Sequence, residues 1–246
     1  MLLVHKTLIS SHSIKSAFEI IAQDWNRLRE KPWPVLIEFL KKIDDFKFDS
    51  KDYLLDLGCG NGRHSLFFSN KVAHVIGVDF SCNLLRIANK KRKTLNIDNI
   101  SYLMADISSL PFKAEMFNKI IFLATLHHIP NRMNRLSSLN EIKRMLKSSG
   151  SCLITVWRRW QKRFFWHFFK QLFHYLLKLK SFGEFGDIFI PWTRQDGEIV
   201  QRFYHLFTHR EIRKLIKKAG FQMVLSEIIG GAMQRENIFA IVTKGG

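Results

Sequence analysis

The segment Asp56-Leu57-Gly58-Cys59-Gly60-Asn61-Gly62 has the composition of a backbone turn that can approach a ligand closely. It follows a short apolar run, and glycine lacks the Cβ that would hold a ligand away. The spacing is G-x-G-x-G, and Arg63 and His64 follow directly, so the turn lacks the third glycine of a dinucleotide-binding turn. The pattern therefore favours a nucleotide ligand and disfavours a nicotinamide or flavin dinucleotide.

Two further carboxylates stand beyond the glycine turn. Asp79 closes the apolar run 73–78, about twenty residues on, where a carboxylate can accept hydrogen bonds from both hydroxyls of a ribose. Asp106 follows the run 100–104 and is placed to receive an adenine amino group. Each feature alone also fits an ordinary turn or a helix N-cap, but together they predict a nucleotide cofactor.

These residues require a parallel sheet to position them. Five apolar runs alternate with helical stretches, and this alternation predicts parallel strands with helices on both faces. The runs are 53–57, 73–78, 100–104, 119–124 and 151–156. Two later runs, 221–227 and 237–243, are separated by about nine residues, too few for a crossover helix, and so predict a terminal antiparallel hairpin.

Helical periodicity predicts a two-helix N-terminal cap over residues 14–45, broken at Lys31-Pro32-Trp33-Pro34. Phe18, Ile21 and Trp25 share one face of this cap, which fits either core packing or a cover over the cofactor. The helix after the fourth strand is expected to end in a glycine C-cap at Gly150. The helix before the terminal hairpin is expected to start with a capping box at Thr208.

Charge and cysteine content limit the partners and the compartment. Lys plus Arg number 39 against 21 Asp plus Glu, a formal net charge of +18, which predicts a polyanionic partner. Cys59, Cys82 and Cys152 form no C-x-x-C pair, so neither a disulfide framework nor a metal site is expected. The N-terminal apolar run is too short for a secretory signal, and a cytoplasmic location is expected.

The acids, the glycines and the terminal hairpin together resemble the class I S-adenosylmethionine-dependent methyltransferases. This resemblance implies a Rossmann-like seven-stranded α/β sheet forming a single domain over residues 1–246, with S-adenosylmethionine as the cofactor. The implied cofactor-binding residues are Phe18, Trp25, Asp56, Gly58, Cys59, Gly60, Asn61, Gly62, Asp79, Phe80, Ala105, Asp106, Ile107, Leu123 and His127.

Further motifs are similar to those of the tRNA wobble-uridine carboxymethyl methyltransferases, which esterify 5-carboxymethyluridine in the anticodon loop. They are Phe18-Glu19-Ile20-Ile21-Ala22, Arg29-Glu30-Lys31-Pro32-Trp33-Pro34, Leu126-His127-His128-Ile129, Val156-Trp157, Ile190-Pro191-Trp192 and Gln201-Arg202-Phe203-Tyr204-His205-Leu206-Phe207. Phe203 departs from the tyrosine that is usual there, and residues 158–187 show no match.

A carboxylate substrate needs donors that hold it but no general base, because it is already ionised at pH 7. Arg29, Arg202, Tyr204 and His205 are the donors expected around it, with His127 or His128 near the methyl group. Arg202 could instead pair with a surface acid and Tyr204 could be a core residue. The histidines could touch the substrate or support the site from behind.

Residues 157–180 contain nine aromatic residues, seven Arg or Lys and no acid, and form part of a basic aromatic insert over 157–187. The spread of positive charge excludes a membrane-spanning helix. One helical stripe is expected to pack on the body: Trp157, Trp160, Phe164, Phe168, Leu172, Tyr175 and Leu179. A second apolar surface is expected from Phe165, Trp166, Phe169, Phe173 and Leu177. RNA, a membrane surface or a protein could use it, and the basic composition favours RNA.

The strand at 100–104 is expected at an edge of the sheet, where an apolar strand can bind another chain. The resemblance implies a small zinc-ribbon activator protein there. The favoured function is a tRNA methyltransferase acting on the anticodon loop. The alternatives are a small-molecule methyltransferase on a membrane surface and a catalytically silent RNA-binding subunit.

Overall fold

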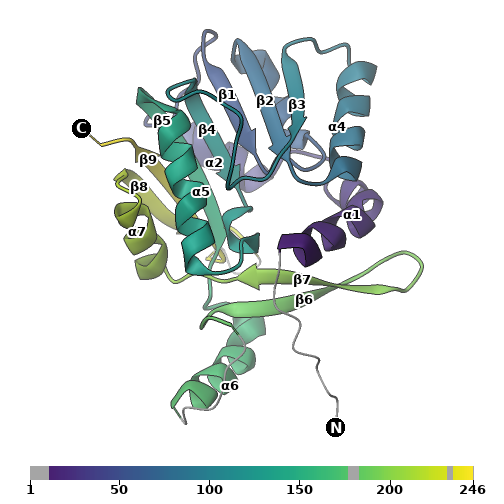
Figure 1. Cartoon of the computed structure of the whole chain (residues 1–246), viewed down its shortest axis with the longest axis vertical. Coiled ribbons are helices and arrows are strands. Elements are labelled where there is room, and N and C mark those ends of the chain that lie inside the picture. The colour runs from purple at the N-terminus through teal and green to yellow at the C-terminus, as the bar shows by residue number, and fades with distance from the viewer. Residues whose placement is uncertain (1–10, 177–182, 232–234, 246) are drawn as a thin grey trace.

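The computed structural model describes residues 11–176, 183–231 and 235–245. Its centre is a seven-stranded sheet in the order β3-β2-β1-β4-β5-β9-β8 (Figure 1). Its strands are β1 (Tyr53–Leu57), β2 (His74–Asp79), β3 (Ile100–Met104), β4 (Phe117–Leu123), β5 (Leu146–Trp157), β8 (Gln222–Ile229) and β9 (Asn237–Thr243). β1 to β5 pair in parallel, and β9 runs antiparallel to both β5 and β8. The predicted α/β sheet with its terminal hairpin is therefore confirmed.

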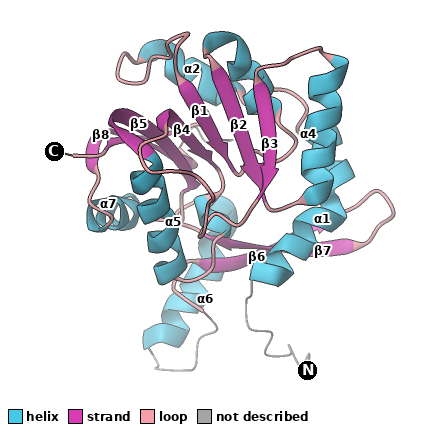
Figure 2. Cartoon of the chain, turned by 45° about the horizontal axis from the view of Figure 1, so that its top comes forward, coloured by secondary structure: helices cyan, strands magenta, loops and turns pink. Residues whose placement is uncertain are grey.

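Helices cover both faces of this sheet (Figure 2). α5 (Arg132–Met145) and α7 (His209–Lys218) bury Leu139, Ile142 and Ile212 against one face. α2 (Pro34–Lys42) and α3 (Arg63–Phe68) bury Leu36 and Phe68 against the other, and α4 (Cys82–Thr94) runs beside β3. Because the central strands β1, β4 and β9 are buried on both faces, their sequences are almost continuously apolar.

The N-terminal cap is confirmed as α1 (Ser11–Leu28) followed by α2. α1 lies between α4 and the strand β7, and Glu19 fixes it to the start of α4. The Glu19 carboxylate accepts hydrogen bonds from the Ser81 hydroxyl and from the backbone N–H groups of Cys82 and Asn83, at 3.0, 2.6 and 2.9 Å. An acid there satisfies the unpaired N–H groups of a helix N-terminus.

A second, two-stranded sheet was not predicted. β6 (Asp187–Thr193) and β7 (Ile199–His205) form an antiparallel hairpin that lies across the carboxyl end of the large sheet (Figure 1). Within the hairpin, His205 Nδ1 lies 2.7 Å from Asp187 Oδ1. His205 Nε2 attaches the hairpin to α7, since it lies 2.8 Å from Glu211 Oε1. Arg159 donates to the other Glu211 oxygen at 2.6 Å. Glu211 also completes the predicted capping box with Thr208.

The helix predicted from residue 157 starts only at Phe165, as α6 (Phe165–Leu176). β5 continues to Trp157, and Arg158 then pairs with Phe207 in a β-bridge, so Trp157 and Trp160 are not helical; Phe164 ends a short 3-10 helix, Lys162–Phe164. Within the stripe, Phe168 is buried as predicted, whereas Trp160 and Leu172 are exposed. The second apolar surface is confirmed for Phe165, Trp166, Phe169 and Phe173; Leu177 and Leu179, and the side chain of Tyr175, lie outside the described residues.

The predicted C-cap at Gly150 is wrong, because α5 ends at Met145 and β5 begins at once. Gly150 lies inside the strand, where a Cβ would press on Leu146 and on the backbone of Asn118. Close packing, and not a left-handed turn, therefore explains this glycine. In the described part of the chain, no helix is long and apolar enough to cross a membrane.

Candidate functional site

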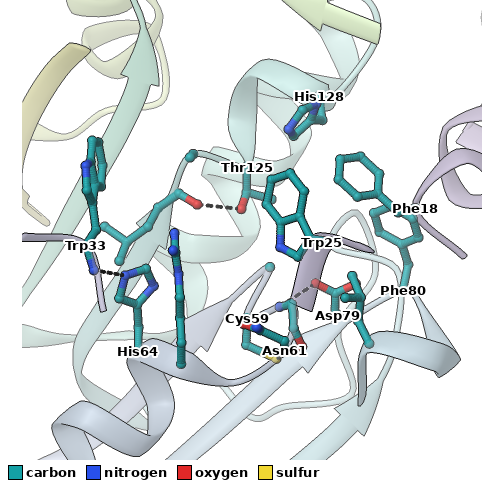
Figure 3. Close-up of a pocket in the computed structure, with 16 residues that line it drawn as sticks. Phe18, Trp25, Trp33, Cys59, Asn61, His64, Asp79, Phe80, Thr125 and His128 are labelled. Atoms are coloured by element: carbon teal, nitrogen blue, oxygen red, sulfur yellow. Dashed lines mark hydrogen bonds between the residues drawn. The ribbon is translucent and has the colours of Figure 1, made fainter. Parts of the chain in front are cut away.

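A pocket opens at the carboxyl ends of β1, β2 and β4, under α1 (Figure 3). It is lined by Phe18, Trp25, Trp33, Gly58, Cys59, Gly60, Asn61, Arg63, His64, Asp79, Phe80, Leu84, Leu123, Ala124, Thr125 and His128. This is the place where an open α/β sheet binds ligands. Nine of the predicted cofactor-binding residues are among them: Phe18, Trp25, Gly58, Cys59, Gly60, Asn61, Asp79, Phe80 and Leu123.

The three glycines of the turn, Gly58, Gly60 and Gly62, have different structural roles. All three have positive φ angles, of 73°, 54° and 74°, which favour glycine. A Cβ on Gly58 would collide with Thr125, and a Cβ on Gly62 would collide with Tyr102, so these two glycines serve close packing within the protein. A Cβ on Gly60 would meet only the Trp25 indole nitrogen, at 3.9 Å. Gly60 is therefore the glycine that keeps backbone open toward the pocket.

Asp79 fixes the glycine turn from the end of β2. Its Oδ2 accepts the Gly60 N–H at 2.8 Å, and its Oδ1 accepts the Ser81 N–H at 2.9 Å. Burial raises the pKa of Asp79 to about 6 against these hydrogen bonds, which lower it. Asp56 lies behind the turn, where it accepts the Ser65 hydroxyl at 2.6 Å. Burial raises the Asp56 pKa to about 7, and this residue supports the turn without lining the pocket.

Phe18 and Trp25, two aromatic residues of α1, line the pocket (Figure 3). Phe18 packs edge-on against Trp25, Phe80 and His128, with ring centroids 5.7, 5.9 and 4.8 Å apart. Trp25 lies over the glycine turn, whereas Ile21 is fully buried in the packing of α1 against the hairpin. The shared face of α1 thus contributes both to the pocket and to the core.

The end of α1 and the start of α2 are attached directly to the glycine turn. The side-chain amide of Asn61 donates to Asn26 Oδ1 and to the Arg29 carbonyl oxygen, both at 3.0 Å. His64 Nε2 accepts the Trp33 N–H at 3.2 Å (Figure 3). Burial holds the pKa of His64 well below its usual range, so the ring is a neutral acceptor. Trp33 was in a quoted motif and His64 follows the glycine turn, but spacing alone did not show that they meet.

The two histidines of the Leu126-His127-His128 turn have separate positions. His128 lines the pocket, and its Nδ1 donates to the Phe203 carbonyl oxygen at 2.9 Å. Burial lowers the pKa of His128 to about 3. His127 lies behind it, where Nδ1 accepts the Trp157 N–H at 3.1 Å and burial holds its pKa well below the usual range. Both rings are neutral near pH 7.

Beside the histidines, β7 contributes a buried arginine without an acid. Arg202 is 7% exposed, and its Nη1 donates to the Tyr204 hydroxyl at 2.8 Å. Its guanidinium carbon lies 4.7 Å from the Trp192 ring centre. Its Nε has no hydrogen-bond partner, and no Asp or Glu lies within salt-bridge distance, among the described residues. The alternative that Arg202 pairs with a surface acid is therefore not seen in the part of the chain that the structure describes.

Tyr204 is the second buried member of this cluster. Its ring stacks against both Trp157 and His127, at centroid distances of 4.8 and 5.2 Å. Burial raises the pKa of Tyr204 and lowers that of Arg202; the nearby charge of Arg29 adds to the lowering at Arg202. Arg29 itself is exposed, with its guanidinium 5.7 Å from the Trp25 ring centre. The cluster thus concentrates positive charge next to neutral aromatic walls.

Several predicted site residues lie elsewhere. Asp106 is exposed, and its Oδ1 accepts the N–H and hydroxyl of Ser108 at 2.8 and 2.6 Å; neither it nor Ala105 or Ile107 lines the pocket. His205 has protein carboxylates on both ring nitrogens, so it holds the hairpin and offers no free donor. Among the described residues, no group of three or more His, Cys, Asp or Glu side chains could hold a metal ion.

A model of the Methyltransferase domain family matches residues 48–224, which include every strand of the parallel sheet and the glycine turn. The chain belongs to this family. The methyltransferase is 26% identical to the tRNA (carboxymethyluridine(34)-5-O)-methyltransferase of Schizosaccharomyces pombe, over 94% of the chain and 96% of that protein. It is 30% identical to the Mus musculus tRNA (carboxymethyluridine(34)-5-O)-methyltransferase ALKBH8, over 58% of this chain but only 20% of that longer protein.

Solved structures share the fold of this methyltransferase at low sequence identity. The structure of a DhpI-SAM-HEP complex matches with a TM-score of 0.68 at 15% identity, covering 95% of this chain and 99% of that chain. A putative methyltransferase in complex with the Haloferax volcanii Trm112 methyltransferase activator matches with a TM-score of 0.64 at 14% identity, covering 95% and 98%. The predicted Rossmann-like methyltransferase fold is confirmed, and the predicted cofactor and wobble-uridine resemblance agree with these names.

Proposed function

We propose that this methyltransferase transfers a methyl group from S-adenosylmethionine to the carboxylate of a 5-carboxymethyl-type wobble uridine in the anticodon loop of tRNA, forming the methyl ester. The observation that carries the proposal is Arg202, a buried guanidinium without an acidic partner beside the pocket. A buried charge is costly unless it is paired, so its site fits an anionic substrate. The names of the relatives point to the same substrate.

The pocket fits the proposed cofactor. The Asp79 carboxylate would accept the ribose hydroxyls, and the open backbone at Gly60 would allow close approach. Phe80 and Leu123 would supply apolar walls for the adenine, and Trp25 would cover the cofactor from α1. Asp106 would need to leave its turn with Ser108 to reach the adenine. When bound, S-adenosylmethionine supplies an electrophilic methyl group on a sulfonium.

The residues around Arg202 would supply positioning and no proton transfer. One substrate carboxylate oxygen forms the new bond to the methyl carbon as the carbon–sulfur bond breaks, and sulfur keeps the electron pair. Arg202 and Tyr204 would hold the second oxygen by charge-assisted hydrogen bonds, with Arg29 adding positive charge. Holding the attacking oxygen in line with the methyl carbon and the sulfur can lower the activation barrier for methyl transfer by about 7–11 kcal/mol. His128, neutral and fixed by the Phe203 carbonyl, would shape the wall beside the methyl group.

Positive charge and an unpaired target fit an RNA substrate. The net charge of +18 would attract the phosphate backbone, and binding should weaken steeply as salt is raised. Bases of an anticodon loop are already unpaired, so placing one in the pocket costs little unstacking energy. A cytoplasmic, single-domain enzyme is part of this proposal.

A small zinc-ribbon activator would bind at the edge strand β3. β3 ends the sheet on one side, and its last residue, Met104, is 54% exposed. Leu95, just after α4, is 59% exposed. An exposed strand edge next to apolar side chains is suited to pairing with another chain. Co-expression with such an activator should raise the yield and activity; full solubility and activity of the chain alone would contradict this part of the proposal.

The proposed reaction is tested with tRNA from cells that lack this methyltransferase. The purified chain, with its activator where required, is incubated with that tRNA and S-adenosylmethionine, and the nucleosides are analysed by mass spectrometry. We expect the carboxymethyl nucleoside to decrease as its methyl ester appears. Methylation of a small acid but not of tRNA would favour the membrane-surface alternative. Binding of tRNA without any methyl transfer would favour the silent RNA-binding subunit.

A further inference from the structure

One side of α6 exposes a continuous row of large apolar side chains. The row consists of Phe165, Trp166, Phe169, Leu172, Phe173 and Leu176, which are 41–70% exposed. Their spacing of 0, 1, 4, 7, 8 and 11 residues places them on one face of an α-helix. Scattered apolar residues on a surface are ordinary, but a contiguous patch marks an interaction site. We call this row the α6 stripe.

The opposite side of α6 attaches the helix to the hairpin. Phe168 is buried in a cluster with Ile188 and Leu206. Gln171 donates to the Asp187 carbonyl oxygen at 3.1 Å and accepts the Gly186 N–H at 3.1 Å. In Figures 1 and 2, α6 projects from the hairpin on the side away from the seven-stranded sheet. The stripe is therefore outside the cofactor pocket, and the proposed methyl transfer does not use it.

The chemistry of the stripe fits lipid better than RNA. Its rings pack on one another, with centroid distances of 5.6 Å for Phe165 and Trp166 and 5.9 Å for Trp166 and Phe169. No charged residue interrupts the stripe, whereas a surface for single-stranded RNA combines separated stacking rings with cations for the backbone. Lys162 and Arg163 stand just before the helix, and the sequence 157–183 contains no acid. Aromatic residues beside basic ones suit the interface of an anionic bilayer.

The length of α6 decides how it would meet a bilayer. Its 12 residues span about 18 Å as a helix, against about 30 Å for the hydrocarbon core. The helix can therefore lie along the interface but cannot cross it. We propose that the α6 stripe inserts into the headgroup region of an anionic lipid bilayer and holds the methyltransferase on the membrane surface. This proposal goes beyond the tRNA reaction and does not depend on the substrate.

The test is co-sedimentation of the full chain with vesicles of phosphatidylcholine alone and of phosphatidylcholine containing phosphatidylserine. We expect stronger binding to the anionic vesicles, and roughly tenfold weaker binding for the double variant Trp166→Ser/Phe169→Ser. The matched control is Met133→Ser/Val224→Ser, which removes two exposed apolar side chains, one from α5 and one from β8. All of these variants keep the net charge, so only the apolar contribution changes. The control pair should bind vesicles like the unchanged protein.

The same variants separate lipid from the other possible occupants. Without lipid, Trp166→Ser/Phe169→Ser should keep its affinity for tRNA and its methylation rate. A tenfold loss of tRNA affinity in that variant would overturn the proposal in favour of an RNA contact. Concentration-dependent self-association that the variant abolishes would overturn it in favour of a second copy of the chain. Unchanged vesicle binding by the variant would also refute it, whatever the outcome for tRNA methylation.

Discussion

Replacing Arg202 with methionine tests the proposed carboxylate site directly. The guanidinium is buried, donates to Tyr204 and has no acidic partner among the described residues. Hydrogen bonds to charged groups are worth about 1.5–3 kcal/mol each, so losing the Arg202 bond to the substrate carboxylate should cost about that much. Since 1.36 kcal/mol is about tenfold, we expect kcat/KM for tRNA to fall roughly 10- to 100-fold, with S-adenosylhomocysteine binding nearly unchanged.

The same substitution should have little effect on stability. Methionine keeps most of the volume between Trp192 and Tyr204, and the lost hydrogen bond to the Tyr204 hydroxyl, about 1 kcal/mol, is offset because a buried charge is removed. At about 2–4 °C per kcal/mol for a chain of this size, the melting temperature should stay within roughly 4 °C. The Arg202→Met variant should therefore lose methylation activity while its melting temperature changes little.

Two other arginines provide the contrast. Arg135 is also buried, but it pairs with Glu184 and donates to the Ile129 carbonyl oxygen at 3.0 Å. Arg135→Met should therefore lower the melting temperature more than Arg202→Met. Arg194, on the same hairpin as Arg202, pairs with Asp196 at 2.9 Å, and Arg194→Met should affect neither measurement. The reasoning is refuted if Arg202→Met retains kcat/KM within about threefold, or if it melts as early as Arg135→Met.

Lowering the pH through about 6 should weaken S-adenosylhomocysteine binding, because burial raises the pKa of Asp79 to about 6 and its carboxylate becomes protonated below that value. Calorimetry between pH 8 and 5 measures this, and pH-dependent binding that persists in Asp79→Asn would disprove the assignment. Gly60→Ala, at φ 54°, should cost about 1–2 kcal/mol of stability and abolish cofactor binding, whereas Gly58→Ala should fail to fold because its Cβ would collide with Thr125. Circular dichroism measures the folding and calorimetry the cofactor binding. An unchanged cofactor affinity in Gly60→Ala would contradict the role of Gly60 in keeping the backbone open toward the pocket. His205→Asn should destabilise the fold by about 2 kcal/mol or more at unchanged cofactor affinity; an unchanged melting temperature would show that the contacts with the two carboxylates are not stabilising.

Features that depend on residues close together in the sequence could be predicted from the sequence alone. Strand β1 and the glycine turn are local features, since apolar runs and glycines depend on the backbone of their own segment. The capping box at Thr208 was predictable for the same reason, because its hydrogen bonds join residues three apart. Asp79 and Trp25 could be placed in the pocket because the carboxyl ends of parallel strands meet and the cap precedes the first strand.

Predictions failed where a distant segment competed with the local pattern. Gly150 resembled a helix end, but close packing against Leu146 and the Asn118 backbone placed it in a strand. The aromatic periodicity after Trp157 suggested one long helix, but bridge pairing of Arg158 with Phe207 continues the extended chain first. The hairpin β6–β7 was missed for a different reason. Its two strands are neighbours in the sequence and pair with each other, but neither shows the alternation of polar and apolar residues that predicts a strand.

The amino-acid sequence by itself determined the class of sheet, the nucleotide-type turn and the surplus of positive charge, because each of these is a property of composition or of short-range spacing. Only the tertiary structure decided which donors remain unpaired. Arg202 and His205 stand three residues apart on one strand, yet folding surrounds His205 with Asp187 and Glu211 and leaves Arg202 without an acid. Charge pairing depends on which distant side chains come within a few ångströms, and no local pattern contains that information.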